Sequence, residues 1–137
     1  MGDLEQTTGD RNGPLVGLRV LDLTKQIAGP FCTMILADMG AEVVKLKRPG
    51  KGDSVRAWGD GSERNPYFRY INRNKKGITL DYKQAQGKAL LLRLVETMDV
   101  LVENYRPTVM PRAGARLRRV TRDQPAADLR PALRSRL

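Results

Sequence analysis

The sequence of 137 residues contains no histidine and a single cysteine. Without histidine, the chain lacks the side chain that serves most often as a general base and as a metal ligand. One cysteine cannot form an intrachain disulfide or a metal site built from several cysteines. We therefore expect no metal site.

Long apolar runs are also missing. No stretch reaches the roughly 20 apolar residues that a helix needs to cross a bilayer. The first thirteen residues, MGDLEQTTGDRNG, lack the basic-then-apolar order of a signal peptide. These features predict a soluble, cytoplasmic protein without a membrane partner.

The charge is strongly positive and unevenly distributed. The chain has 25 Lys and Arg against 15 Asp and Glu, a net charge of +10. Residues 111–137 contain eight Arg, two Asp and no Lys, so they account for +6 of that total. Such a charge attracts phosphates and nucleic acids in general. Aromatic side chains do not alternate with the basic ones as stacking platforms would, so a nucleic-acid-binding protein is the less favoured alternative.

The pattern divides the chain into three parts. Residues 1–13 are polar and unpatterned, which is typical of a flexible arm. Residues 14–112 carry the apolar periodicity of one small folded domain. Residues 113–137 form a divergent basic tail whose high charge and weak apolar pattern predict disorder or irregular structure.

The segment 19–49 predicts a strand, a helix and a second strand. Apolar runs at 20–23 and 43–46 have the length and composition of strands. Between them Pro30 suits a helix start and Gly40 a helix end. Phe31, Met34, Ile35 and Met39 lie at helical spacing and predict the helix face that packs on the core. This is one βαβ unit.

A second unit follows along the chain. Residues 78–80 predict a strand, 83–98 a helix with Gly87, Leu91, Leu94, Val95 and Met98 on one face, and 100–102 another strand. Residues 72–77 have turn composition, and 67–71 fit a short helix or an extended segment. Two successive βαβ units predict an α/β fold with a partial, Rossmann-like parallel sheet flanked by helices.

Basic residues gather at the end of the second predicted strand. Lys45, Lys47 and Arg48 lie at the carboxyl edge, where open α/β sheets bind ligands, so we expect an anion there. Trp58, in the long loop that follows, is either a lid on the core or part of a ligand wall. Cys32 fits a buried small apolar residue better than a reactive thiol.

Three stretches resemble the amino-terminal part of the class III CoA-transferases, the family that also contains α-methylacyl-CoA racemase. They are VLDLT…AGPFCTMILADMGAEVVKLKRPGKGD at 20–53, YFRYINRNKKGITLD at 67–81 and DVLVENYRPTVM at 99–110. The resemblance covers about residues 15–112. Three blocks in the family's order make a much more specific signal than any single motif.

The resemblance implies that residues 14–112 bind coenzyme A. Arg48 matches a position that contacts the adenosine-phosphate part, Leu80 and Lys83 match positions that line the adenine, and Gln26 and Ile27 match the loop near the pantetheine. Asn104, Tyr105, Arg106 and Arg112 match a CoA-contacting segment after the fourth strand. Without the family, a solvated surface charge is the better interpretation of any one basic residue, and Leu80 and Tyr105 could be ordinary core residues. Their shared position at strand ends on one edge makes a binding site about equally favoured.

The family also implies a reaction. Its members move CoA between an acyl-CoA and a carboxylic acid through an aspartyl-CoA intermediate, and full-length members form interlocked homodimers. The nucleophilic aspartate lies beyond the matched region, so we assign no catalytic residue here. The racemase branch needs a histidine, which this sequence lacks. We expect a truncated CoA-binding half that is inactive alone; a non-catalytic CoA-binding module is the alternative.

The tail suggests a further hypothesis. Family members typically continue with a phrase like INPRLIY, and one set of codons for DQPAADLR at 123–130 encodes INPRLIY when read one nucleotide later. We therefore hypothesise that residues 113–137 are a frameshifted reading of a longer gene. The nucleotide sequence after codon 112 decides this, because a continuation must be encoded in another frame.

Overall fold

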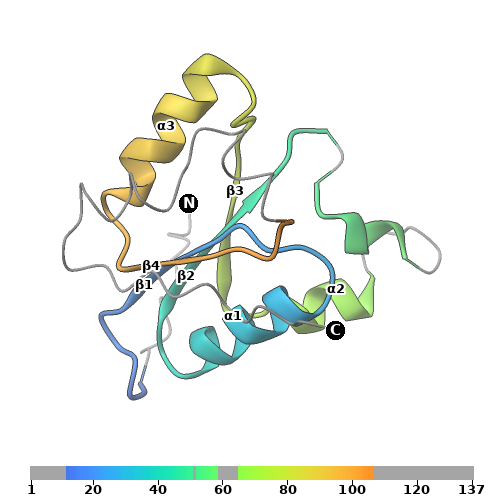
Figure 1. The fold of residues 1–137 in the computed structure, drawn as a ribbon. Coiled ribbons are helices and arrows are strands. Elements are labelled where there is room, and N and C mark those ends of the chain that lie inside the picture. The colour runs from blue at the N-terminus through green and yellow to red at the C-terminus, as the bar shows by residue number, and fades with distance from the viewer. Residues whose placement is uncertain (1–11, 51, 59–64, 107–137) are drawn as a thin grey trace, which may run out of the picture.

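The computed structural model of the chain describes residues 12–50, 52–58 and 65–106 (Figure 1). Its elements follow in chain order. They are β1 (Arg19–Asp22), α1 (Ala28–Asp38), β2 (Glu42–Lys47), the 3-10 helix η1 (Ser54–Ala57), α2 (Pro66–Ile71), β3 (Lys75–Thr79), α3 (Ala85–Val95) and β4 (Val100–Val102).

The four strands form one sheet in the order β3-β2-β1-β4, and every neighbouring pair is parallel. The unit β1–α1–β2 joins adjacent strands, whereas α3 carries the chain from β3 past two strands to β4 at the other edge. Figure 1 shows α1 and α2 on one side of the sheet and α3 on the other. The predicted α/β fold with a parallel sheet and two βαβ units is confirmed.

Alternate residues of the strands supply two cores because successive side chains point to opposite faces. On one face, Leu21 of β1 belongs to a buried cluster that includes Leu91 and Val95 of α3. On the other face, Val20 belongs to a cluster that includes Ala37 of α1. The central strands are therefore buried on both faces, as parallel sheets require.

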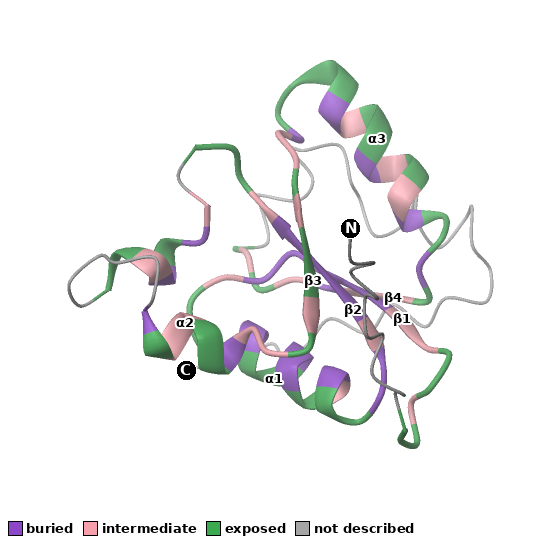
Figure 2. Cartoon of the chain, turned by 180° about the vertical axis from the view of Figure 1, so that it is seen from behind, coloured by how far each residue is buried: buried purple, intermediate pink, exposed green. Residues whose placement is uncertain are grey.

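The prediction for the buried face of α1 was wrong. Of its four apolar residues at helical spacing, only Met34 is buried, whereas Phe31, Ile35 and Met39 are each more than 40% exposed. The helix instead packs through a face that contains Gly29, Pro30, Thr33, Met34 and Ala37. Figure 2 shows this division, with buried residues of α1 toward the sheet and exposed ones away from it. Small side chains let the helix lie close to the strands, and apolarity alone does not identify them.

The helix ends were predicted better. Gly40 follows α1 with φ 99°, a left-handed conformation that glycine adopts without strain, and it donates its N–H to the carbonyl of Ala37. In α3, Gly87, Leu91 and Val95 are buried as expected.

Some boundaries differ from the prediction. Helix α3 spans Ala85–Val95 and not 83–98, so Met98 lies after the helix. The turn before β3 is shorter, because the strand begins at Lys75 and includes Gly77. Asn74 supplies the left-handed residue, with φ 62°. The segment that the pattern left undecided is helix α2, whose start is capped by the Asn65 side chain accepting from the N–H of Phe68.

Several predictions lie outside the described residues. They are the boundaries of the arm, whose residues 1–11 are not described, the tail 113–137, and Arg112. Within the described part, no helix is both long and apolar enough to cross a membrane.

Candidate functional site

The carboxyl edge of the sheet collects the loops that follow all four strands. Parallel strands end at the same edge, and ligands bind there where the strand order reverses. In this sheet that place lies between β1 and β4. Eight of the nine predicted site residues follow these strand ends, and Arg112 lies outside the described residues. The eight are Gln26, Ile27, Arg48, Leu80, Lys83, Asn104, Tyr105 and Arg106.

The loops after β1 and β4 are joined by one side chain. The Oδ1 atom of Asn104 accepts from the N–H of Lys25 at 2.9 Å, and its Nδ2 atom donates to the carbonyl of Lys25 at 2.8 Å. This pair of hydrogen bonds fixes the backbone of Lys25. The amide of Asn104 is therefore used within the protein, so its role in the structure is to position the β1 loop.

The residue after Lys25 has an unusual backbone. Gln26 has φ 65°, a left-handed conformation that non-glycine residues adopt rarely and often at functional sites. Its side chain is exposed, and so is that of Ile27, which precedes α1 without a side-chain cap. Both predicted pantetheine-side residues are thus accessible at the edge.

The charges of two other cations act on Lys25 at this edge. Burial lowers the pKa of Lys25, and the charge of Arg48 lowers it further, as does that of Lys83 to a smaller extent; Tyr82 and Asp53 oppose this. In the part of the chain that the structure describes, neither Arg48 nor Lys83 has a carboxylate within 4.0 Å. The edge therefore carries positive charge that no described side chain neutralises.

Two tyrosines border these cations. The hydroxyls of Tyr82 and Tyr105 lie 3.2 Å apart in a hydrogen bond, and the Lys25 ammonium lies 5.0 Å from the centroid of the Tyr105 ring. Burial, and then the hydrogen bond from Tyr82, raise the pKa of Tyr105, so it stays a neutral phenol. Leu80 and Tyr105 are half-buried against the α3-side core, so each already contributes to packing.

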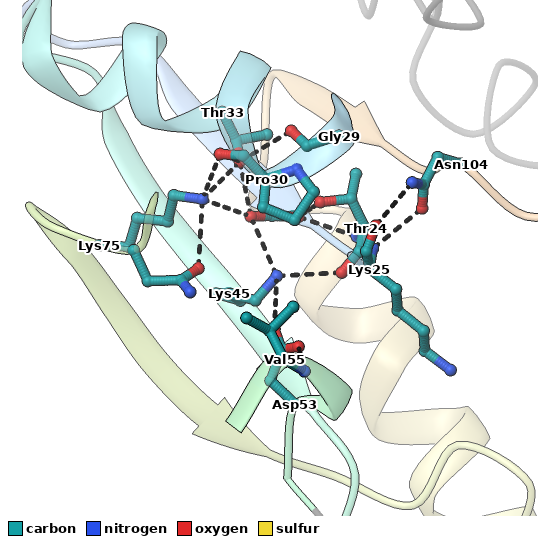
Figure 3. A network of polar contacts seen from close by, with 12 residues as sticks. Thr24, Lys25, Gly29, Pro30, Thr33, Lys45, Asp53, Val55, Lys75 and Asn104 are labelled. Atoms are coloured by element: carbon teal, nitrogen blue, oxygen red, sulfur yellow. Dashed lines mark hydrogen bonds and ion pairs between the residues drawn. The ribbon is translucent and has the colours of Figure 1, made fainter. Parts of the chain in front are cut away.

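Beneath the edge lies a buried network of charged side chains (Figure 3). The Oδ2 atom of Asp22 lies 3.1 Å from Lys75 Nζ and 3.6 Å from Lys45 Nζ. The hydroxyls of Thr24 and Thr33 donate to the same carboxylate at 2.5 and 2.6 Å. Asp22 is fully buried, so these partners replace the water that it loses on folding.

This network overturns the predicted role of Lys45 in anion binding. Its side chain is only 3% exposed and also lies 3.3 Å from Asp53 Oδ2, and it donates to the carbonyl of Thr24 at 2.9 Å. Asp53 in turn accepts from the N–H of Val55 at the start of η1. Lys45 therefore links the loop after β1 to the loop after β2 and is not available to a ligand.

The network changes the ionisation of its members. Burial alone would raise the pKa of Asp22, but Lys45, Lys75 and the two threonine hydroxyls outweigh it and hold that pKa below 3.8. Burial lowers the pKa of Lys75 from 10.5, and Asp22 opposes this shift. Pairing thus opposes the effect of burial on the pKa of both groups.

Glycine is required where α1 approaches the network. Any Cβ at Gly29 would collide with the Thr24 side chain. This close packing lets Thr33, one turn later, reach Asp22.

In the described part of the chain, no group of three or more His, Cys, Asp or Glu could hold a metal ion.

Two further expectations are corrected. Cys32 is exposed, not buried, because it lies on the outer side of α1. Trp58 is 41% exposed and stacks on the ring of Tyr67, with centroids 5.7 Å apart, so it is not a lid on the core.

Sequence reasoning missed Lys25 and the buried network. Lys25 lies just after the first predicted strand, as Arg48 does after the second, but the search for basic residues considered only the end of the second strand. No sequence signal reveals the network, because Asp22, Lys45 and Lys75 belong to three different strands.

Comparison with known proteins identifies a family. A profile of CoA-transferase family III matches residues 15–126, which is further than the resemblance to residue 112. Succinyl-CoA:glutarate CoA-transferase of Mus musculus is 45% identical over 111 residues, covering 80% of this chain and 26% of the mouse protein. Acetyl-CoA:oxalate CoA-transferase of Acetobacter aceti is 43% identical over 111 residues, covering 80% of this chain and 28% of that protein.

Solved structures agree with this comparison. A hypothetical protein from Mycobacterium tuberculosis superimposes with a TM-score of 0.76 at 38% identity, covering 85% of this chain and 31% of that one. A CaiB/BaiF family protein from Brucella suis gives 0.75 at 35% identity, covering 82% and 31%. The chain spans about a quarter of the length of the curated relatives it matches.

Proposed function

This chain belongs to CoA-transferase family III, and we propose that the carboxyl edge of its sheet binds the ADP end of an acyl-CoA. The observation that carries this proposal is the uncompensated positive charge of Arg48 and Lys83 at the edge. Arginine binds phosphate oxygens through two parallel hydrogen bonds, and lysine contributes a point charge. Coenzyme A presents three phosphates in its 3′-phosphorylated ADP.

Within this proposal the predicted residues have separate roles. Arg48 binds phosphate, and we assign Lys83 to phosphate as well because of its charge, whereas the resemblance placed it along the adenine. Arg106 adds charge where β4 ends, and Leu80 and Tyr105 form the apolar side of the adenine site. The exposed Gln26 and Ile27 border the path of the pantetheine toward the reacting thioester. Asn104 acts indirectly, through the two hydrogen bonds that hold the loop after β1.

The proposed reaction transfers CoA from an acyl-CoA to a carboxylic acid. An aspartate carboxylate attacks the thioester carbonyl and expels CoA thiolate, which leaves an acyl-aspartyl anhydride. The thiolate then attacks the aspartyl carbonyl and releases the donor acid, which forms aspartyl-CoA. An acceptor carboxylate repeats these two steps in reverse, takes the CoA and frees the aspartate.

We assign that aspartate to sequence beyond the family-like region of this chain. On this proposal, the 137 residues are the CoA-binding part of a longer transferase. Its complete form acts as a homodimer. A CoA-binding module without catalysis is the alternative for the chain alone, and it predicts the same binding without turnover.

Isothermal titration of CoA into the 137-residue chain tests the binding proposal. Arg48→Ala should weaken the binding free energy by about 1–3 kcal/mol, which is the typical cost of removing one partner of a charge-assisted hydrogen bond. Arg93→Ala is the matched control. Arg93 is an exposed arginine in the last turn of α3, whereas Lys83 of the proposed site precedes the first turn of that helix. Equal affinity for the two variants would remove Arg48 from the site, and tighter binding of duplex DNA than of CoA at physiological salt would favour the nucleic-acid alternative.

A further inference from the structure

Lys25 differs from the other lysines near the centre of the sheet. Figure 3 shows the ammonium groups of Lys45 and Lys75 turned into the buried network, whereas the side chain of Lys25 runs away from it. Lys45 and Lys75 each contact at least one carboxylate within 3.3 Å. For Lys25 the described residues provide no such ion pair, and its ammonium lies instead over the Tyr105 ring at 5.0 Å.

The position of Lys25 is fixed more firmly than that of an ordinary surface lysine. Asn104 binds both its N–H and its carbonyl, and Lys45 holds the carbonyl of the preceding residue, Thr24. The side chain of Lys25 therefore extends from a backbone that hydrogen bonds hold in place. This backbone lies between β1 and β4, where the strand order reverses.

The charges that face Lys25 favour an anion beside it. Arg48 from the loop after β2 and Lys83 from the loop after β3 act on Lys25 with like charge. The groups that oppose them are the Tyr82 phenol and the Asp53 carboxylate, and Lys45 already lies 3.3 Å from that carboxylate. The exposed Arg48 and Lys83, from two other loops, therefore repel the half-buried Lys25, and a multiply charged anion would relieve that repulsion.

We propose that Lys25 is a phosphate-binding residue and completes, with Arg48 and Lys83, a three-cation site for a phosphate group of the nucleotide end of CoA. The proposal rests on the proposed CoA site and adds a contact from the loop after β1. The Tyr105 ring, 5.0 Å from the ammonium, would border a phosphate held there.

Binding of CoA and of dephospho-CoA, which lacks the 3′-phosphate, tests this assignment. Lys25→Met should weaken CoA binding about tenfold, because it removes one charge-assisted contact. Lys25→Arg retains the charge and should stay within about threefold of the unaltered chain. Arg93→Met removes a positive charge far from the edge and serves as the control.

The two ligands identify the phosphate. A tenfold loss for CoA but not for dephospho-CoA assigns Lys25 to the 3′-phosphate, and an equal loss for both assigns it to the diphosphate. If the unaltered chain binds CoA and Lys25→Met binds each ligand as tightly as the unaltered chain does, the inference is overturned while the proposed function stands. If the unaltered chain binds neither ligand, the proposed function fails first, and this inference fails with it.

A measurement on the unaltered side chain covers the case in which Lys25→Met does not fold. After reductive methylation with labelled formaldehyde, the dimethyl signal of Lys25, assigned by its absence in Lys25→Arg, should shift when CoA is added. The signal of Lys88, a lysine of α3 without an ion pair among the described residues, should stay unchanged. A Lys25 signal that does not move at saturating CoA contradicts the proposed contact.

Discussion

Replacing Lys45 by Met removes the cation that lies between two buried carboxylates. Its Nζ atom lies 3.3 Å from Asp53 Oδ2 and 3.6 Å from Asp22 Oδ2. Methionine fills a similar volume, so the main loss is electrostatic. Asp22 keeps its contact with Lys75 at 3.1 Å. Asp53, whose side chain is 2% exposed, keeps among the described residues the N–H of Val55.

The magnitude follows from what each carboxylate retains. Removing one partner of a buried ion pair typically costs about 3–5 kcal/mol, because the other charge stays buried without compensation. Here Asp22 remains paired and the deficit falls mainly on Asp53. We therefore expect the free energy of unfolding to fall by about 3 kcal/mol, the lower end of that range.

Urea denaturation at neutral pH, followed by circular dichroism and by Trp58 fluorescence, measures this loss. The control is Lys76→Met, in the neighbouring strand, where Lys76 pairs with Glu42 at 2.7 Å but is 58% exposed. An exposed pair contributes at most about 1 kcal/mol. Equal losses for the two variants would refute the view that the network stabilises the edge, whereas a Lys45→Met chain that is unfolded without urea meets the expectation.

A second substitution separates charge from packing. In the Lys45→Met background, Asp53→Asn removes the uncompensated carboxylate and keeps an oxygen that can accept from Val55. The double variant should be more stable than the sum of the single losses predicts, with a coupling of at least about 0.5 kcal/mol. Strict additivity would show that Lys45 and Asp53 do not interact.

Two other predictions concern pH and activity. Asp22 has a folded pKa below its ordinary 3.8, so its stabilising contribution is present above that pH and is lost as the pH falls through the folded pKa. The difference in unfolding free energy between the unaltered chain and Asp22→Asn should therefore narrow on acidification from about pH 5 to about pH 2, and a constant difference would contradict the assigned pairing. The 137-residue chain by itself should exchange no CoA between an acyl-CoA and a free acid, since no acyl-enzyme forms without the nucleophilic aspartate. Turnover by a preparation whose intact mass matches 137 residues would disprove that assignment.

Local sequence determines most of the secondary structure and the order of its elements. The apolar runs before and after α1, the glycine at position 40 and the periodicity of α3 act over short distances, and each lies in the element predicted for it. A strand–helix–strand order fixes parallel pairing and the handedness of the crossover. The residues that follow each strand therefore reach one edge, which is why the anion site was predicted there.

Only the tertiary structure decided which side chains face which partners. Apolarity predicted that Phe31 and Ile35 of α1 would be buried, but the helix packs through the smaller Gly29 and Thr33 because these allow a closer approach to the strands. Charge predicted that Lys45 would bind a ligand, yet it lies inside. A lysine is buried where carboxylates from other elements compensate its charge, and this depends on contacts between residues that are distant in sequence.

The same reason separates Lys25 from Lys45. Lys45 lies in β2 and Lys25 lies in the loop just after β1, and the sequence alone does not distinguish their roles. In the fold, Asp22 and Asp53 meet Lys45, whereas Lys25 meets the like charges of Arg48 and Lys83. Lys45 thereby stabilises the fold, and Lys25 is the lysine that we propose to bind an anion, because the role of a charge depends on the charges that the fold places beside it.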